Sequence, residues 1–406
     1  MSVILPSSVS YGESLPALPD NTQCINITAA PTNGASFSSG QQIFLDLVNR
    51  GFLVPDSMYL AYSYVLASAA GAELIGCPAA TCFNRLDVSV GSQTIDTIQN
   101  YNIFYHMLTN VTYDVAQKYG NQASLGYFNS TSVPNLEQLD GRVCVINEAG
   151  SFAMPLISLL SNSEKLIPLF AMPQVRLTLT MESLATMFTS AVVPTGFTIS
   201  NVQLRYKVVD FGGAVEQIVL GSSDKLYIKS QSFAIASQTL VAGSSGYIEL
   251  VFNQRYASVK SLFAINGVGT LLSNRAFDSC DLTSGNGDYS FMVGGVLYPP
   301  APINTRTAKT MALLELKSAV GSIFDKNNNM AINSVEFNYN STAATSTISA
   351  PAKFYVGTSL EKLNSNNLLT GISTQNSPIS YRINTGTAIG ANNSTITLVA
   401  NYDALI

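Results

Sequence analysis

The chain has 406 residues, of which 47% are hydrophobic and only 11% charged, and its formal net charge is −5. This length predicts two or three domains with large cores, while the charged fraction lies well below the roughly 25% of an ordinary soluble domain. The first basic residue is Arg50, so the sequence has no basic N-terminal arm of the kind that neutralises phosphates, and direct nucleic-acid binding is not expected.

Residues 1–20 are rich in Ser and Pro and are charged only at Glu13 and Asp20. They predict an extended N-terminal arm, and two interpretations stay open: an arm that orders against neighbouring subunits, or a disordered terminus. The segment has no basic n-region and no long apolar core, so it is a poor secretory signal. No apolar run of roughly 18 residues occurs anywhere, so no membrane-spanning helix is predicted.

The first half of the chain predicts strands interrupted by a single helix. Strand candidates are 42–49, 58–67, 86–90, 93–98, 152–160, 165–170, 175–182 and 199–211, with a turn at Gly51 and Pro55 and a long loop over 121–150. The stretch 199–211, ISNVQLRYKVVDF, alternates apolar and polar residues, which predicts a strand with one buried face, stopped by Gly212-Gly213. Between 100 and 119 apolar residues recur four apart, which predicts an amphipathic helix ended by Gly120.

The second half follows the same plan. Strand candidates are 227–235, 247–252, 258–265, 289–296, 335–339, 354–357, 379–383 and 396–401, with a polar loop over 273–288. The segment 298–302, YPPAP, is excluded from any sheet because proline lacks the N–H that a ladder needs. Over 307–323 apolar residues recur at helical spacing, which predicts the one helix of this half.

A long-period repeat relates the two halves. The run 45–48, LDLV, recurs as IELV at 248–251, and a Ser-led apolar stretch follows at Ser57 and again at Ser258. One helix follows in each half. This duplication predicts an all-β protein with two tandem eight-stranded jelly-roll sandwiches, each with one short inserted helix. We expect the arm to span 1–20, the first sandwich 21–212 and the second 213–406.

No motif in the sequence predicts catalysis, a cofactor or a metal. The single histidine, His106, falls on the predicted helix and is expected to be a structural residue. Asp278 and Asp281 fall in a polar loop, where a solvated loop or a weak cation site is more plausible than acid/base chemistry. Gly294-Gly295 precedes prolines, not a helix start, and so is no phosphate loop. The expected catalytic, cofactor-binding and metal residues are therefore none.

The five cysteines are expected to be small buried thiols, because their spacing fits neither a zinc site nor a disulfide framework. They are Cys24, Cys77, Cys82, Cys144 and Cys280. Six Asn-x-Ser/Thr sequons begin at Asn26, Asn110, Asn129, Asn340, Asn392 and Asn393, and they are expected to reflect composition alone, since no secretory signal accompanies them.

Several stretches, taken in order, resemble the double jelly-roll major capsid proteins of icosahedral DNA viruses, in particular those of Polinton-like viruses, virophages and large algal viruses, within the lineage of the adenovirus hexon. The stretches are DSMYL at 56–60, FNRLDV at 83–88, Gly91 with IQNYN at 98–102, 199–211, 289–302 with the helix of 307–323, FYVG at 354–357, LTGI at 369–372 and NYDALI at 401–406. The resemblance covers nearly the whole chain and is carried by the order of the motifs.

The resemblance implies a major capsid protein without enzymatic activity. Three copies would form a pseudo-hexagonal homotrimeric capsomer that tiles an icosahedral shell in the virion. The implied partners are neighbouring capsomers, penton and minor capsid proteins, and an internal membrane, with no sequence-specific nucleic acid and no cofactor. Low charge and many Ser, Thr and Asn side chains suit wide, partly polar lateral contacts.

Two alternatives stay open. The first is a minor or vertex capsid protein of the same lineage, which differs by copy number in a purified particle. The second is a secreted carbohydrate-binding β-sandwich protein, although the chain has no Trp and shows no aromatic cluster that would form a sugar platform.

Overall fold

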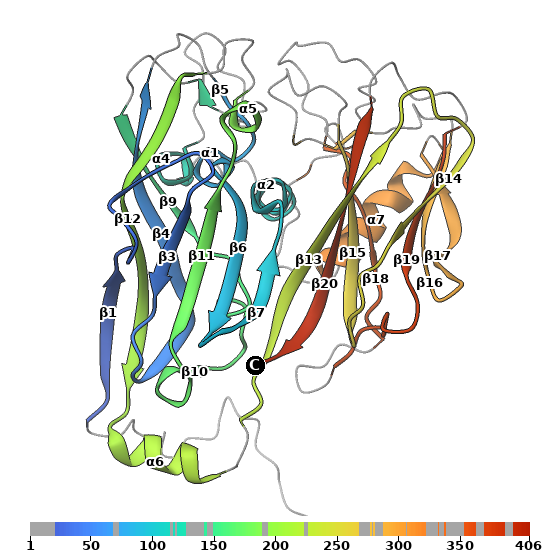
Figure 1. Ribbon diagram of the computed structural model, residues 1–406. Coiled ribbons are helices and arrows are strands. Elements are labelled where there is room, and N and C mark those ends of the chain that lie inside the picture. Colours follow the sequence, from blue (N-terminus) through green and yellow to red (C-terminus); the bar gives the residue numbers. More distant parts are fainter. Residues whose placement is uncertain are drawn as a thin grey trace, which may run out of the picture.

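A computed structural model describes most of the chain. The described residues are 21–67, 73–113, 117, 120–126, 142–143, 149–188, 194–222, 226–267, 277, 279–280, 287–305, 307–321, 332, 337, 353–362, 369–385 and 393–406. The fold consists of two β-sandwiches that stand side by side (Figure 1). Within these residues, no helix is long and apolar enough to cross a membrane.

The first sandwich contains two large antiparallel sheets and a small two-stranded one. Its strands are β1 (Gln23–Ala29), β2 (Ser36–Ser38), β3 (Gln42–Asp46), β4 (Phe52–Ala67), β5 (Glu73–Leu74), β6 (Phe83–Val90), β7 (Gln93–Ile98), β8 (Arg142–Val143), β9 (Ala149–Pro155), β10 (Ile167–Pro168), β11 (Val175–Met181) and β12 (Gly196–Asp210). One sheet runs β1-β12-β4-β10, with β2 on β12 and β9 on β4, and the other runs β3-β11-β6-β7. Its helical segments are α1 (Pro78–Thr81), α2 (Tyr101–Thr112), α4 (Gln122–Leu125), η2 (Leu169–Ala171) and α5 (Leu184–Met187).

The second sandwich repeats this strand order. Its elements are β13 (Lys229–Leu240), β14 (Tyr247–Phe252), β15 (Val259–Asn266), β16 (Asp288–Val293), β17 (Val296–Asn304), α7 (Lys309–Val320), β18 (Val356–Ser359), β19 (Ile379–Asn384) and β20 (Ser394–Leu405). The sheet β13-β20-β15-β18 matches β1-β12-β4-β10, and β14-β19-β16-β17 matches β3-β11-β6-β7. Helix α2 follows β7 just as α7 follows β17. The predicted pair of jelly-roll sandwiches with an inserted helix in each is therefore confirmed. The LDLV run begins in β3 and continues past its end, and the IELV run lies within the equivalent strand β14.

The alternation of apolar and polar residues along the strands places the apolar side chains in the cores of the sandwiches. Along β12, Leu204, Tyr206 and Val208 are buried between the sheets, while Arg205 and Lys207 face outwards. Strand β11 alternates in the same way, with Leu177 and Leu179 fully buried. Each such side chain contributes about 1.5–3 kcal/mol on burial, so the register of these strands is strongly fixed.

Several predicted strand boundaries were wrong. The predicted strand 165–170 is reduced to β10, because the chain turns into η2 at Leu169. The YPPAP segment lies inside β17, because β17 is an edge strand and its ladder with β16 shifts register between Tyr289 and Phe291, which leaves room for prolines without N–H groups. Strand β4 begins at Phe52 and includes Pro55, because its pairing with β12 also shifts register nearby. The predicted strand 152–160 ends at Pro155, and its remaining residues form a connecting segment.

The helices also differ in part from their predictions. Helix α2 ends at Thr112, because Tyr113 takes an extended conformation. Gly212-Gly213 stops β12 as predicted, but a further helix that the sequence did not predict, α6 (Gly213–Ser222), begins immediately afterwards. Within the predicted loop 121–150 the structure places α4, β8 and the start of β9. Residues 1–20 and most of 335–339 and 273–288 lie outside the described residues.

Candidate functional site

Buried polar and charged side chains join the two sandwiches along the surface where they meet. This surface is formed by β7, α2 and the segment 156–164 of the first sandwich, and by β13 and β20 of the second (Figure 1). We call this surface the seam. Both β7 and β13 are edge strands of their sheets, so the seam joins two edges that would otherwise stay open to solvent.

Asp96 lies at the centre of the seam. It occupies a buried position of β7, on the same strand face as the fully buried Ile98, and is only 4% exposed. One carboxylate oxygen accepts hydrogen bonds from Ser232 Oγ at 2.6 Å and Tyr402 Oη at 3.4 Å, both in the second sandwich. The other accepts one from the backbone N–H of Leu159 at 3.1 Å. A single carboxylate therefore ties a strand of one sandwich to two strands of the other.

Burial raises the pKa of Asp96, and the hydrogen bonds from Ser232, Leu159 and Tyr402 offset part of that shift. Tyr402 stacks on Tyr256 with ring centroids 3.9 Å apart, and burial together with the Asp96 carboxylate raises the pKa of the Tyr402 hydroxyl. Asp96 therefore accepts hydrogen bonds in an environment with little water. Hydrogen bonds to a charged group are stronger there than in water, so they contribute more to holding the two sandwiches together.

Further contacts extend the seam on either side of Asp96. Ser230 Oγ donates to the carbonyl of Leu159, and Asn162 Nδ2 donates to the carbonyl of Gln231 at 3.2 Å. At the start of α2, Asn100 Nδ2 donates to Ser237 Oγ at 3.0 Å. These contacts pair side chains of one sandwich with backbone or hydroxyl groups of the other, so the seam is polar along much of its length.

Helix α2 also contributes apolar contacts to the seam. Its Phe104 packs on Phe233 of β13 with ring centroids 4.5 Å apart, and its Asn110 Nδ2 donates to Tyr355 Oη at 3.1 Å. The inserted helix of the first sandwich thus contacts the second sandwich directly, a role that its position in the sequence did not reveal.

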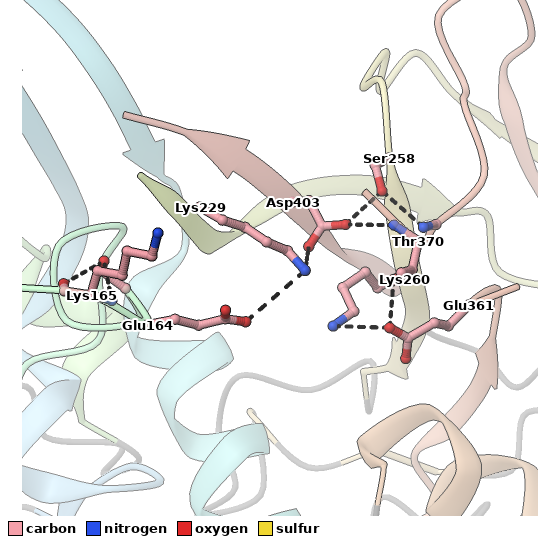
Figure 2. Close-up of polar contacts among 10 residues, drawn as sticks. Glu164, Lys165, Lys229, Ser258, Lys260, Glu361, Thr370 and Asp403 are labelled. Atoms are coloured by element: carbon pink, nitrogen blue, oxygen red, sulfur yellow. Dashed lines mark hydrogen bonds and ion pairs between the residues drawn. The ribbon is translucent and has the colours of Figure 1, made fainter. Parts of the chain in front are cut away.

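The seam ends in a charged cluster around Lys229 (Figure 2). Lys229 Nζ lies 4.0 Å from Glu164 Oε1 of the first sandwich and 3.7 Å from Asp403 Oδ1 on β20. The side chain of Asp403 is fully buried, and its other oxygen accepts hydrogen bonds from Ser258 Oγ at 2.7 Å and from the N–H of Thr370 at 3.3 Å. Lys229 therefore connects a buried carboxylate of the second sandwich to a half-buried one of the first.

A second ion pair lies beside this cluster within the second sandwich. Lys260 Nζ is 3.2 Å from Glu361 Oε1, which also accepts a hydrogen bond from Thr370 Oγ1 at 2.6 Å (Figure 2). Thr370 thereby links the two carboxylates, Asp403 and Glu361. These contacts connect β15 and β20 to the segments that carry Glu361 and Thr370, next to the seam.

The described residues among those considered for chemistry lie in different sandwiches. His106 is fully buried on α2, with Nε2 2.9 Å from Asn110 Nδ2. Gly294 and Gly295 form the tight turn between β16 and β17, both at positive φ. Asp278 and Asp281 lie outside the described residues. Among the residues that the structure describes, no group of three or more His, Cys, Asp and Glu side chains could hold a metal ion.

The cysteines follow the expectation of buried thiols in three of four described cases. Cys77, Cys82 and Cys280 are buried, whereas Cys24 is exposed on β1, an edge strand. Cys144 lies outside the described residues. Asn110 of the predicted sequons is buried, so it is closed to modification in the folded chain.

Sequence reasoning missed Asp96, Lys229 and Asp403. One signal was present: Asp96 stands two residues before Ile98, on the buried face of a predicted strand, where an acidic side chain is unusual. The partners that explain it, Ser232 and Tyr402, lie in the other half of the chain.

Comparison with solved structures finds this fold in proteins of several viruses. The Faustovirus major capsid protein matches with a TM-score of 0.67 and 8% identity, over 100% of this chain and 93% of that chain. PBCV-1 VP54, whose crystal structure was fitted into a reconstruction of the virophage Sputnik, matches with a TM-score of 0.64 and 10% identity, over 98% of this chain and 97% of that chain. A chain of the Sputnik virophage structure matches with a TM-score of 0.57 and 11% identity, over 100% and 91% of the two chains.

At these identities the likeness shows a shared fold. Since it extends over nearly the full length of both chains, it includes both sandwiches, and the double jelly-roll fold implied by the resemblance is confirmed. No protein-family model matches the sequence, and no curated protein matches it.

Proposed function

We propose that this chain is a viral major capsid protein that assembles as homotrimers into pseudo-hexagonal capsomers of an icosahedral shell. The observation that carries the proposal is the pair of sandwiches whose four main sheets have matching strand orders, held side by side by a buried seam. The full-length likeness to the Faustovirus major capsid protein supports it. The role is structural, and its site of action is the virion.

The proposal divides the chain into an arm at 1–20, a first sandwich at 21–212 and a second at 213–406. The strands of the two sheet pairs fall within these bounds, from β1 to β12 and from β13 to β20. Because one chain supplies two similar modules, three chains supply six, and a threefold ring then approximates sixfold symmetry. Neighbouring capsomers, penton and minor capsid proteins, and an internal membrane are the proposed partners.

The faces that would close this ring are those directed away from the seam. In the second sandwich the sheet β14-β19-β16-β17 lies on the side far from the first sandwich (Figure 1). Its edge strand β14 exposes Tyr247 and Val251, and Glu249 between them pairs with Arg382. Exposed aromatic side chains such as Tyr247 are enriched at protein interfaces.

Size-exclusion chromatography with light scattering tests the proposal. We expect a species of about 130 kDa, three times the 43.2 kDa of the chain, and a six-lobed particle in negative-stain micrographs. Tyr247→Asp with Val251→Asp should shift the protein towards monomer, whereas Val241→Asp, in the exposed turn after β13, should not. A native protein that stays monomeric at high concentration would overturn the proposal.

A further inference from the structure

Helix α6 and the C-terminus lie at the same end of the molecule (Figure 1), and large apolar side chains on and beside these elements are exposed. Ile218 and Leu220 on α6 are 69% and 56% exposed, Tyr227 just before β13 is 66% exposed, and Leu405 at the end of β20 is 55% exposed. We call these four residues the basal apolar surface. Side chains of this kind gathered at one end of a soluble protein mark a site that something covers.

The chemistry of α6 favours an uncharged, apolar occupant. The helix reads GAVEQIVLGS and carries one acidic residue, Glu216, and no basic residue. Helices that lie on membrane surfaces usually present Lys and Arg to the lipid headgroups. The occupant of the basal apolar surface is therefore better sought in an apolar peptide than in an anionic lipid surface.

The N-terminal segment leaves the fold at this very place. Gln23 pairs with Asp210 at the end of β12, and a Cβ on Gly212 would lie 3.9 Å from the Asn21 side chain. Residues 1–20 therefore connect to the fold beside the first turn of α6. In an extended conformation 20 residues reach about 65 Å.

The composition of residues 1–20 matches the basal apolar surface. Apolar side chains gather in two groups, Leu15 with Leu18 and the run Val3-Ile4-Leu5. Counted along an extended chain from Asn21, the nearer group can reach about 20 Å and the farther one about 60 Å. Prolines at 6, 16 and 19 favour an extended chain that can follow a surface.

We propose that residues 1–20 pack on the basal apolar surface of their own chain. The covalent link at Asn21 gives the segment an effective concentration in the millimolar range at this surface, which favours the chain's own segment over that of another copy. The proposal is independent of capsid assembly, because it concerns a contact within one chain.

A tryptophan reporter tests the proposal directly, because the chain has no Trp. In Leu18→Trp the single indole should show a blue-shifted emission and slow quenching by acrylamide in dilute protein, independent of protein concentration. Adding Ile218→Ser and Leu220→Ser should shift the emission to that of an indole in water. The matched control Val241→Ser, which changes an exposed residue beyond the far end of β13, should leave the emission unchanged.

Hydrogen exchange of α6 gives an independent measurement that needs no reporter. In Leu15→Ser with Leu18→Ser the amides of 213–222 should exchange about tenfold faster, the factor that corresponds to ~1.4 kcal/mol. Ser7→Ala with Ser8→Ala is the control and should not change the rate.

Three results would overturn the proposal. In the first, the indole has the emission of free tryptophan and does not respond to the α6 substitutions. In the second, the blue shift grows with protein concentration, so that another copy supplies the segment. In the third, the blue shift appears only with phosphatidylcholine vesicles, so that a bilayer is the occupant.

Discussion

Asp96 shows how one buried carboxylate can govern a contact between two domains. Its three hydrogen-bond donors come from both sandwiches, and burial raises its pKa. An aspartate with a raised pKa binds a proton more readily in the folded protein than in the unfolded chain. The free energy of unfolding should therefore rise as the pH falls from neutrality towards the ordinary aspartate pKa of about 4.

The variant Asp96→Asn removes this titration. We expect the unfolding free energy of the native protein, minus that of the variant, to increase as the pH falls from about 7 to about 4, by at most about 1.4 kcal/mol per pH unit for one proton. Denaturant titrations at several pH values measure the difference. Thr94→Ala, at an exposed position of the same strand, is the control, and a difference that is flat or falls with decreasing pH contradicts the prediction.

At the scale of elements, α2 and β13 meet through one aromatic pair. Phe104 is fully buried, and its ring is tilted by 43° against that of Phe233. We expect a double-mutant cycle with Phe104→Ala and Phe233→Ala to give a coupling of about 0.5–1.5 kcal/mol in unfolding free energy. Additive effects of the two substitutions would mean that α2 is held to the second sandwich by its other contacts.

Much of the element pattern could be predicted from the sequence because it depends on local periodicity. Strands β11 and β12 alternate so strictly that their buried faces can be assigned from the sequence, and the spacing over 307–323 identifies α7. The prolines of β17 were misjudged because edge position is a property of the sheet, not of the segment. Helix α6 was missed because Gly212-Gly213 marks the end of a strand but does not specify the conformation of the next residues.

The candidate site was far less predictable than the fold. The only local sign was the acidic side chain of Asp96 on the buried face of a predicted strand, and a lysine at position 229 is an ordinary residue for an edge strand. Only the packing of the second sandwich against the first makes them buried and paired. A contact between residues so far apart in sequence leaves no local pattern.

At the scale of the whole molecule, the seam should make the two sandwiches unfold together. We expect a single calorimetric transition for the native chain and two separate transitions for Asp96→Ala with Phe104→Ala, because the buried contacts between the sandwiches are then reduced. Leu204→Ala, which should cost about 2–5 kcal/mol within the first core, is the control and should lower the single transition without splitting it. Two transitions in the native protein would contradict this prediction.

The seam also implies that a proposed ring of six modules would contain two kinds of joint in alternation. Within each polypeptide the joint is sealed by a buried aspartate and a covalent connection, and between polypeptides it must be made from entirely different side chains. Such a ring would dissociate at the joints between polypeptides first. Each piece released would still consist of the two sandwiches of one polypeptide, joined to each other.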